Sequence, residues 1–286
     1  MKDIIVDRIN SLKHYTKNNI QELSKANIPY LSDIKLIEQY SYRLEGKTYV
    51  CPSNCKIFMS MNLPYSSIPN STDNTYSMSF LEAVNYKDIF MNEEKSEIML
   101  KKEGQKLDVG GIAKGYAADE VVKILKEYHI QSGLINLGGN VFAFENKPTN
   151  ENWNIGIQNP FDIRGECVGV VSVSNKSVVT SGNYERYFIN NGKRFHHIMN
   201  PLTGNPSENG VISATIISDY SIDGDALSTC AFVMGIEEGL KLAESIKGVD
   251  ALFITENKKI YTTSGIKNEL EVTSKEYLEK SSPEVQ

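Results

Sequence analysis

Between residues 107 and 265 the sequence mixes short segments of strand periodicity with two longer segments of helical periodicity, and the two kinds do not alternate strictly. The helical segments are 112–130 and 225–246, and the strand-like ones are 133–144, 153–157, 169–182, 211–219 and 251–263. Strict alternation would favour a doubly wound parallel sheet, whereas a mixed order favours an α+β or mixed α/β fold. We therefore predict one domain over 1–268, with a mixed sheet and two long helices.

Turn signals refine this prediction. Glycine turns and the Asn257-Lys258 pair predict hairpins over 133–144 and 251–263, and 169–182 is predicted as a hairpin-like pair. Residues 1–24 and 32–42 have helical periodicity, whereas 45–74 looks irregular. The segment 269–286 is polar, and we expect this C-terminal tail to fray.

Charge and hydropathy exclude some function classes. The 286 residues carry a net charge of −6, which argues against a nucleic-acid partner, because phosphate backbones are bound through an excess of Lys and Arg. No apolar run approaches the ~20 residues needed to span a bilayer. The opening MKDIIVDRIN lacks the apolar core of a secretory signal, so as written the protein is expected to be cytoplasmic, with no transmembrane segment.

Two glycine turns are candidates for close approach of a ligand. Asp108 to Gly115 (DVGGIAKG) joins a strand end to a helix, and the unpaired N–H groups of a first helical turn suit a phosphate. On spacing alone, a tight turn that packs the helix on the sheet is the better interpretation. Asn136 to Asn140 (NLGGN) is either a second such turn or an ordinary hairpin.

Three further segments carry reactive side chains. Thr180 to Arg186 (TSGNYER) lines a pocket or is a loop with a surface salt bridge. Two histidines precede Ile-Met-Asn-Pro, and only one of them can address a given site, because neighbours on a strand point to opposite faces. Asp225 and Thr229 share one face of a helix and form a hard-oxygen pair of the kind that Mg²⁺ accepts, although helix capping and back-bonding explain them equally well in isolation.

Taken together and in this order, DVGGIAKGYAAD, NLGGN, TSGNYER, HHIMNPLTGNP and DALSTCAFVMG resemble the ApbE family of FAD:protein FMN transferases. The resemblance runs from about Tyr15 to about Gly265; it is very specific from Leu107 to Gly235 and loose before Leu107. It implies an enzyme that binds FAD in a cleft and uses Mg²⁺ to transfer FMN to a Ser or Thr hydroxyl of an acceptor flavoprotein, releasing AMP. By the same resemblance, the acceptor is a subunit of a flavin-dependent redox complex, and an exported or membrane-associated location, as in many relatives, is the alternative to the cytoplasm.

The resemblance also implies roles for single residues. Mg²⁺ is expected on the Gly111 carbonyl, Asp225 and Thr229, and His197 is the candidate general base, with an orienting or core role as the alternative. Residues expected to contact FAD are Tyr15, Asp108, Lys114, Asn136, Gly138, Gly139, Thr180, Ser181 and Gly182.

Three segments depart from the family pattern. The Met-Gly-Thr strand has no counterpart, residues 44–53 replace a Thr-Gly-Gly-Ala-Phe-Asp-Pro-Thr segment, and Asn200 replaces an aspartate. The first two departures concern the half that encloses the flavin, so we expect retained Mg²⁺ binding and weaker FAD binding. A Mg²⁺-dependent FAD pyrophosphatase that yields FMN and AMP is the runner-up, and a flavin-binding protein without turnover is a third hypothesis.

Overall fold

A computed structural model describes residues 84–92, 97–102, 105, 109–190 and 192–280, together with the strand path of 41–44 and 47–50. The chain divides into two compact units. One comprises residues 1–111 and 188–206, and the other comprises 112–187 and 207–286. The contacts described below between α6, α7 and β9 all lie within the second unit, which we call the sheet unit.

A seven-stranded sheet forms the centre of the sheet unit, in the order β16-β14-β13-β12-β9-β6-β5. Neighbouring strands are antiparallel except β14 and β16, so the sheet is mixed, as predicted. The bounds of its strands are β5 (Gly133–Leu137), β6 (Asn140–Phe144), β9 (Lys176–Gly182), β12 (Val211–Ser218), β13 (Val249–Thr255), β14 (Lys259–Thr262) and β16 (Leu278–Lys280).

A second sheet of three strands packs on one face of the first. It has the order β15-β8-β7, with β7 (Trp153–Gln158), β8 (Cys167–Val173) and β15 (Leu270–Val272). Its apolar side chains share one buried cluster with side chains of the larger sheet, such as Val178 of β9, Ile217 of β12 and Leu252 of β13. Because side chains alternate along a strand, the neighbours of these residues face the opposite side of the larger sheet.

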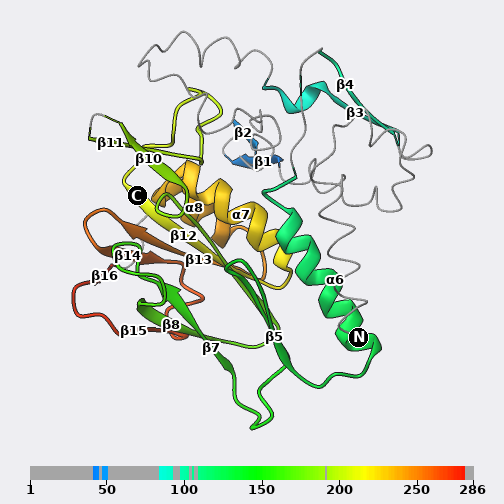
Figure 1. The fold of residues 1–286 in the computed structure, drawn as a ribbon, viewed down its shortest axis with the longest axis vertical. Coiled ribbons are helices and arrows are strands. Elements are labelled where there is room, and N and C mark those ends of the chain that lie inside the picture. Colours follow the sequence, from blue (N-terminus) through cyan, green and yellow to red (C-terminus); the bar gives the residue numbers. More distant parts are fainter. Residues whose placement is uncertain are drawn as a thin grey trace. The chain divides into compact units, whose positions relative to one another are not determined.

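Helices cover that opposite side. They are α6 (Ala113–Glu127), α7 (Ser221–Met234) and α8 (Ile236–Glu244), and Figure 1 shows α6 and α7 crossing close together. α7 packs on β9 and β12, and α6 packs on β5, β6 and α7. Within α6, Val121, Val122 and Ile124 are buried, whereas Leu125 is half-buried.

Both predicted hairpins are confirmed. β5 pairs with β6 through Gly138 and Gly139, whose φ angles of 64° and 91° match a two-residue hairpin turn, and β13 pairs with β14 through a turn with Lys258 at φ 54°. The pair predicted over 169–182 is wrong, because β8 pairs with β7 and β15 whereas β9 pairs with β6 and β12. The chain thus passes from one sheet to the other at this turn.

Two further expectations are corrected. The segment 225–246 is not one helix that opens at Asp225: α7 begins at Ser221, and Gly235 separates it from α8 with a φ of 86° that favours glycine. Asn209 reinforces this end, since its Nδ2 donates to the carbonyl oxygen of Phe232 at 2.8 Å. The tail does not fray throughout, because β15 and β16 extend both sheets.

The other unit contains hairpins. β1 (Ser41–Leu44) pairs with β2 (Lys47–Val50), β3 (Ile89–Asn92) pairs with β4 (Glu97–Leu100), and β10 (Tyr187–Asn190), whose first residue belongs to the sheet unit, pairs with β11 (Lys193–His196). A 3-10 turn, η2 (Tyr86–Asp88), precedes β3. β2 corrects the irregular structure expected for 45–74, and β1 takes up the last two residues of the helix expected over 32–42. The rest of that helix and the helices expected over 1–24 lie outside the described residues.

Candidate functional site

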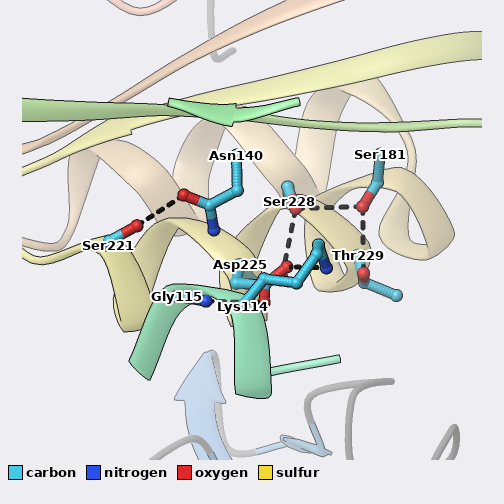
Figure 2. Close-up of polar contacts among 8 residues, drawn as sticks. All are labelled: Lys114, Gly115, Asn140, Ser181, Ser221, Asp225, Ser228 and Thr229. Atoms are coloured by element: carbon cyan, nitrogen blue, oxygen red, sulfur yellow. Dashed lines mark hydrogen bonds and ion pairs between the residues drawn. The ribbon is translucent and has the colours of Figure 1, made fainter. Parts of the chain in front are cut away.

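Asp225 is the centre of the polar contacts between α6 and α7. Its side chain is only 6% exposed, and both carboxylate oxygens are engaged. Oδ1 accepts from Lys114 Nζ at 2.8 Å, and Oδ2 accepts from the backbone N–H of Gly115 at 3.0 Å (Figure 2). The negative charge of this buried carboxylate is therefore balanced by one ammonium and one amide, both from the first turn of α6.

Asp119 makes the reciprocal contact from α6 to α7. Its Oδ1 and Oδ2 accept the backbone N–H groups of Ser221 and Ile222, the first residues of α7, at 2.8 and 2.9 Å. The residues that precede the two helices, Ile112 and Tyr220, make no side-chain capping bond. Each helix therefore receives its N-terminal carboxylate from the other, and this reciprocal capping fixes the register between them.

Close approach of the helices requires Gly115. A Cβ on this residue would lie 2.3 Å from the carbonyl oxygen of Ser221 and 2.5 Å from Ile222 Cα, and neither backbone atom can move independently of α7.

Burial raises the pKa of Asp119 to about 6, although the hydrogen bonds from Ile222 and Ser221 oppose this shift. Nearby Asp223 also raises the pKa, whereas Lys123 lowers it.

Hydroxyl groups line the contact between α7 and β9. Ser181 Oγ lies 2.9 Å from Ser228 Oγ and 3.0 Å from Thr229 Oγ1, and Ser228 Oγ donates to the carbonyl oxygen of Asp225 at 3.1 Å (Figure 2). Ser228 and Thr229 are almost wholly buried. Four of the predicted residues thus come together within the sheet unit: Lys114, Ser181, Asp225 and Thr229.

The remaining predicted residues of the sheet unit make other contacts. Thr180 Oγ1 lies 2.8 Å from Thr215 Oγ1 of the neighbouring strand, and Gly182 packs under the ring of Tyr184. At the exposed turn between β5 and β6, the Asn136 side chain accepts from the N–H of Gly139 at 3.0 Å, next to Gly138. Whether these residues contact FAD stays a prediction.

The other predicted residues lie outside the sheet unit. Gly111 is the last residue before it, and Tyr15 and Asp108 are outside the described residues. His197 follows β11 and is exposed, whereas His196 is buried, with Nδ1 accepting from the N–H of Ile198. The two histidines thus differ in burial, and the role of His197 stays a prediction.

Asn200 supports the turn after the histidines. Its Oδ1 accepts from the N–H of Leu202 at 2.9 Å, a bond that the aspartate of the family pattern could also form.

Sequence reasoning missed three residues of this arrangement, namely Gly115, Asp119 and Ser228. A signal for the first two was present, because Gly115 and Asp119 are four residues apart and share one face of α6. A second signal was the lack of a capping residue at Ile112, where the expected helical segment begins.

The donor set suits a hard divalent cation better than a transition metal. Among the described residues, no cluster of three or more His, Cys, Asp and Glu side chains could hold a metal. Asp225 and Thr229 instead offer a carboxylate and a hydroxyl on successive turns of α7, and a cation already sits against Asp225 in the form of the Lys114 ammonium. Mg²⁺ accepts one or two carboxylates with further oxygens, so these residues fit it.

Comparison with known proteins identifies the family of the chain. A family model described as the ApbE family matches residues 65–253. A relative from Klebsiella pneumoniae named FAD:protein FMN transferase is 40% identical over 177 residues, which are 62% of this chain and 54% of the relative. One of the same name from Treponema pallidum is 41% identical over 183 residues, 61% of this chain and 51% of the relative. The chain thus spans about half the length of these curated relatives.

Solved structures agree with the fold. The ApbE protein of Thermotoga maritima aligns with a TM-score of 0.80 and 25% identity over 94% of this chain and 90% of its own. The flavinyl transferase ApbE of Pseudomonas stutzeri aligns with a TM-score of 0.57 and 28% identity over 67% of this chain and 59% of its own. Both alignments support the mixed α+β fold. Within the described residues, no helix is long and apolar enough to cross a membrane.

Proposed function

The chain belongs to the ApbE family, and from this premise we propose that it is a Mg²⁺-dependent FAD:protein FMN transferase. It would take FAD as substrate and attach the FMN half to a Ser or Thr hydroxyl of an acceptor protein. Relatives that match three fifths of the chain carry this name, which supports the assignment. A subunit of a redox complex is the acceptor that we propose.

The observation that carries the proposal is the carboxylate of Asp225 and the hydroxyl of Thr229, both buried and four residues apart on α7. Asp225, Thr229 and the Gly111 carbonyl would hold Mg²⁺, which neutralises charge on the pyrophosphate and helps to align an in-line displacement. Lys114, whose side chain is 44% exposed, can reach beyond Asp225, and we propose that it contacts the FAD phosphates. The other flavin contacts are proposed as in the sequence analysis.

The reaction makes one bond and breaks one. The acceptor hydroxyl oxygen would bond to the phosphorus of the FMN half, the bond from that phosphorus to the bridging oxygen would break, and AMP would leave with the bridging oxygen. The hydroxyl must lose its proton, and His197 is our candidate to accept it. A positioned general base contributes about 10²–10⁴-fold to the rate of such a step.

One incubation tests the proposal. The protein is mixed with FAD, MgCl₂ and an acceptor that carries a flavinylation motif, and the products are separated by denaturing gel and by chromatography. A fluorescent acceptor band together with AMP supports the transferase. Free FMN and AMP with an unlabelled acceptor would instead indicate a pyrophosphatase, and unchanged FAD would indicate a binding protein.

Two variants complete the test. Asp225→Ala should abolish the transfer, and undiminished turnover would refute the metal assignment. His197→Gln should slow the transfer without weakening Mg²⁺ binding. Equal turnover of His197→Gln and the wild type at every pH would refute the role of His197 as general base.

A further inference from the structure

The three hydroxyls between β9 and α7 form a chain whose direction can be worked out. It runs through Thr229, Ser181 and Ser228 to the main chain of Asp225 (Figure 2). It therefore begins on one proposed metal ligand and ends on the other. Ser181, in the middle, is the only one of these residues that comes from the sheet.

The direction follows from counting protons. A hydroxyl has one proton to donate, and Ser228 donates its proton to the Asp225 carbonyl, which can only accept. Ser228 Oγ must therefore accept from Ser181, and Ser181 Oγ must in turn accept from Thr229. In this arrangement Thr229 donates its hydroxyl proton towards the sheet.

The usual alternative for a helical threonine is blocked. Threonine often donates to the carbonyl four residues earlier, which for Thr229 is again Asp225. That carbonyl has two lone pairs, one for the helical N–H of Thr229 and one for Ser228 Oγ. Ser181 thus offers the acceptor that lets the proton of Thr229 point to β9 rather than along α7.

We propose that Ser181 is a positioning residue of the metal site, which orients the hydroxyl of Thr229 by accepting its proton. The oxygen of Thr229 then directs its electron pairs away from Ser181, and an oxygen electron pair is what a hard divalent cation binds. This inference rests on the metal assignment in the proposed function. It gives Ser181 a role different from the flavin contact expected from the sequence.

Register supplies a matched control on the same strand. Ser177 is four residues before Ser181 and faces the same side of β9, where a Cβ on Gly224 of α7 would lie 2.8 Å from Ser177 Oγ. Ser177 also forms a hydroxyl pair, at 2.8 Å with Ser218 Oγ. Ser177→Ala therefore removes a β9 hydroxyl of the same type that makes no bond to Thr229.

The experiment is an isothermal calorimetric titration of the full chain with MgCl₂ in the absence of FAD. Urea unfolding in EDTA checks that each variant is folded. Ser181→Ala should weaken Mg²⁺ binding by about tenfold or more, the range known for residues that orient metal ligands. Ser181→Thr restores the hydroxyl and should restore most of the affinity. Ser177→Ala should bind Mg²⁺ as the wild type does.

Several outcomes would overturn the proposal. Mg²⁺ affinity of Ser181→Ala equal to that of the wild type, or an equal loss in Ser177→Ala, would refute the role of Ser181. If Ser181→Ala also unfolds at lower urea, then Ser181→Cys, which keeps the volume but accepts weakly, must show the same loss of affinity. Wild-type binding that is absent, or unchanged by Asp225→Ala, would instead refute the metal site itself.

Discussion

Lys114→Met offers a direct test of the charge balance at Asp225. The ammonium lies 2.8 Å from Oδ1, whereas Oδ2 is used by the N–H of Gly115. A divalent cation that binds Asp225 has to compete with Lys114 for Oδ1. Methionine keeps most of the apolar stem and removes the charge, so the variant isolates this competition.

The size of the effect can be estimated from the distance. Two unit charges 2.8 Å apart attract by about 6 kcal/mol at an effective dielectric of 20 and by about 1.5 kcal/mol in bulk water. Because Lys114 is 44% exposed, solvent screening places the pair near the lower value, at about 2 kcal/mol. Without metal, Lys114→Met should lose about this much unfolding free energy, since the buried carboxylate keeps only one partner.

The interaction free energy of the ion pair should also determine how much more tightly Lys114→Met binds Mg²⁺. The wild type breaks the ion pair when it binds Mg²⁺ and the variant has none to break, so Mg²⁺ should bind Lys114→Met about 10- to 30-fold more tightly. Saturating Mg²⁺ should then restore most of the lost stability. FAD binding should move in the opposite direction if Lys114 contacts the phosphates.

Urea unfolding in EDTA and in MgCl₂, with calorimetric titration of Mg²⁺, measures both quantities. The control is Lys123→Met on the same helix, which changes the net charge equally but pairs with Glu120. Lys123→Met should leave Mg²⁺ affinity within about twofold of the wild type, since an exposed ion pair contributes about 1 kcal/mol or less. Unchanged or weaker Mg²⁺ binding by Lys114→Met would refute the competition.

Three further predictions concern Asp119, Gly115 and the flavin. The raised pKa of Asp119 means that its contribution to stability is greatest when it is protonated and is lost as pH rises from 3.8 through about 6. Relative to Asp119→Asn, the wild type should therefore lose about 3 kcal/mol of unfolding free energy over that interval, and a carbon-13 carboxyl titration with its midpoint near the usual value would contradict this. Gly115→Ala should cost about 2 kcal/mol in urea unfolding, because the overlap with α7 outweighs the gain in helix propensity, and a more stable variant would refute the close contact. FAD binding measured by calorimetry should be weak and should depend on Mg²⁺. Tight FAD binding in EDTA would contradict the loss of affinity that we infer from the departures in the flavin-enclosing half.

Local sequence patterns predicted the helices and hairpins well, but they predicted the pairing of the strands less well. The two helical stretches and both hairpins follow from periodicity and turn residues, which act over a few positions. The path from β8 to β9 could not be predicted in this way. A turn at Asn175, with φ 51°, is equally compatible with a hairpin and with a crossing between sheets. Which strand pairs with which is decided by distant segments, here β6, β12 and β15.

The candidate site shows the same limit. Asp225 and Thr229 could be selected from spacing on one helix, and the resemblance to the ApbE family supplied the metal. The sequence could not show that Asp225 also caps α6, because that bond joins residues 110 positions apart. Alternation along a strand predicts that Thr180 and Ser181 point to opposite faces, but it could not show that Ser181 is the one that faces α7.

Reciprocal capping gives the proposed metal site a structural consequence. Oδ2 of Asp225 accepts from the first turn of α6, whereas Oδ1 is the atom for which Lys114 and a metal ion would compete. The carboxylate that would bind metal therefore also holds the first turn of α6. Asp119 holds α7, which carries Thr229, in the same way. Removal of either carboxylate should therefore weaken metal binding and helix packing together. A variant that keeps the carboxylate and changes only its partner, such as Lys114→Met, can separate the two effects, because the cap from Gly115 to Asp225 remains in place.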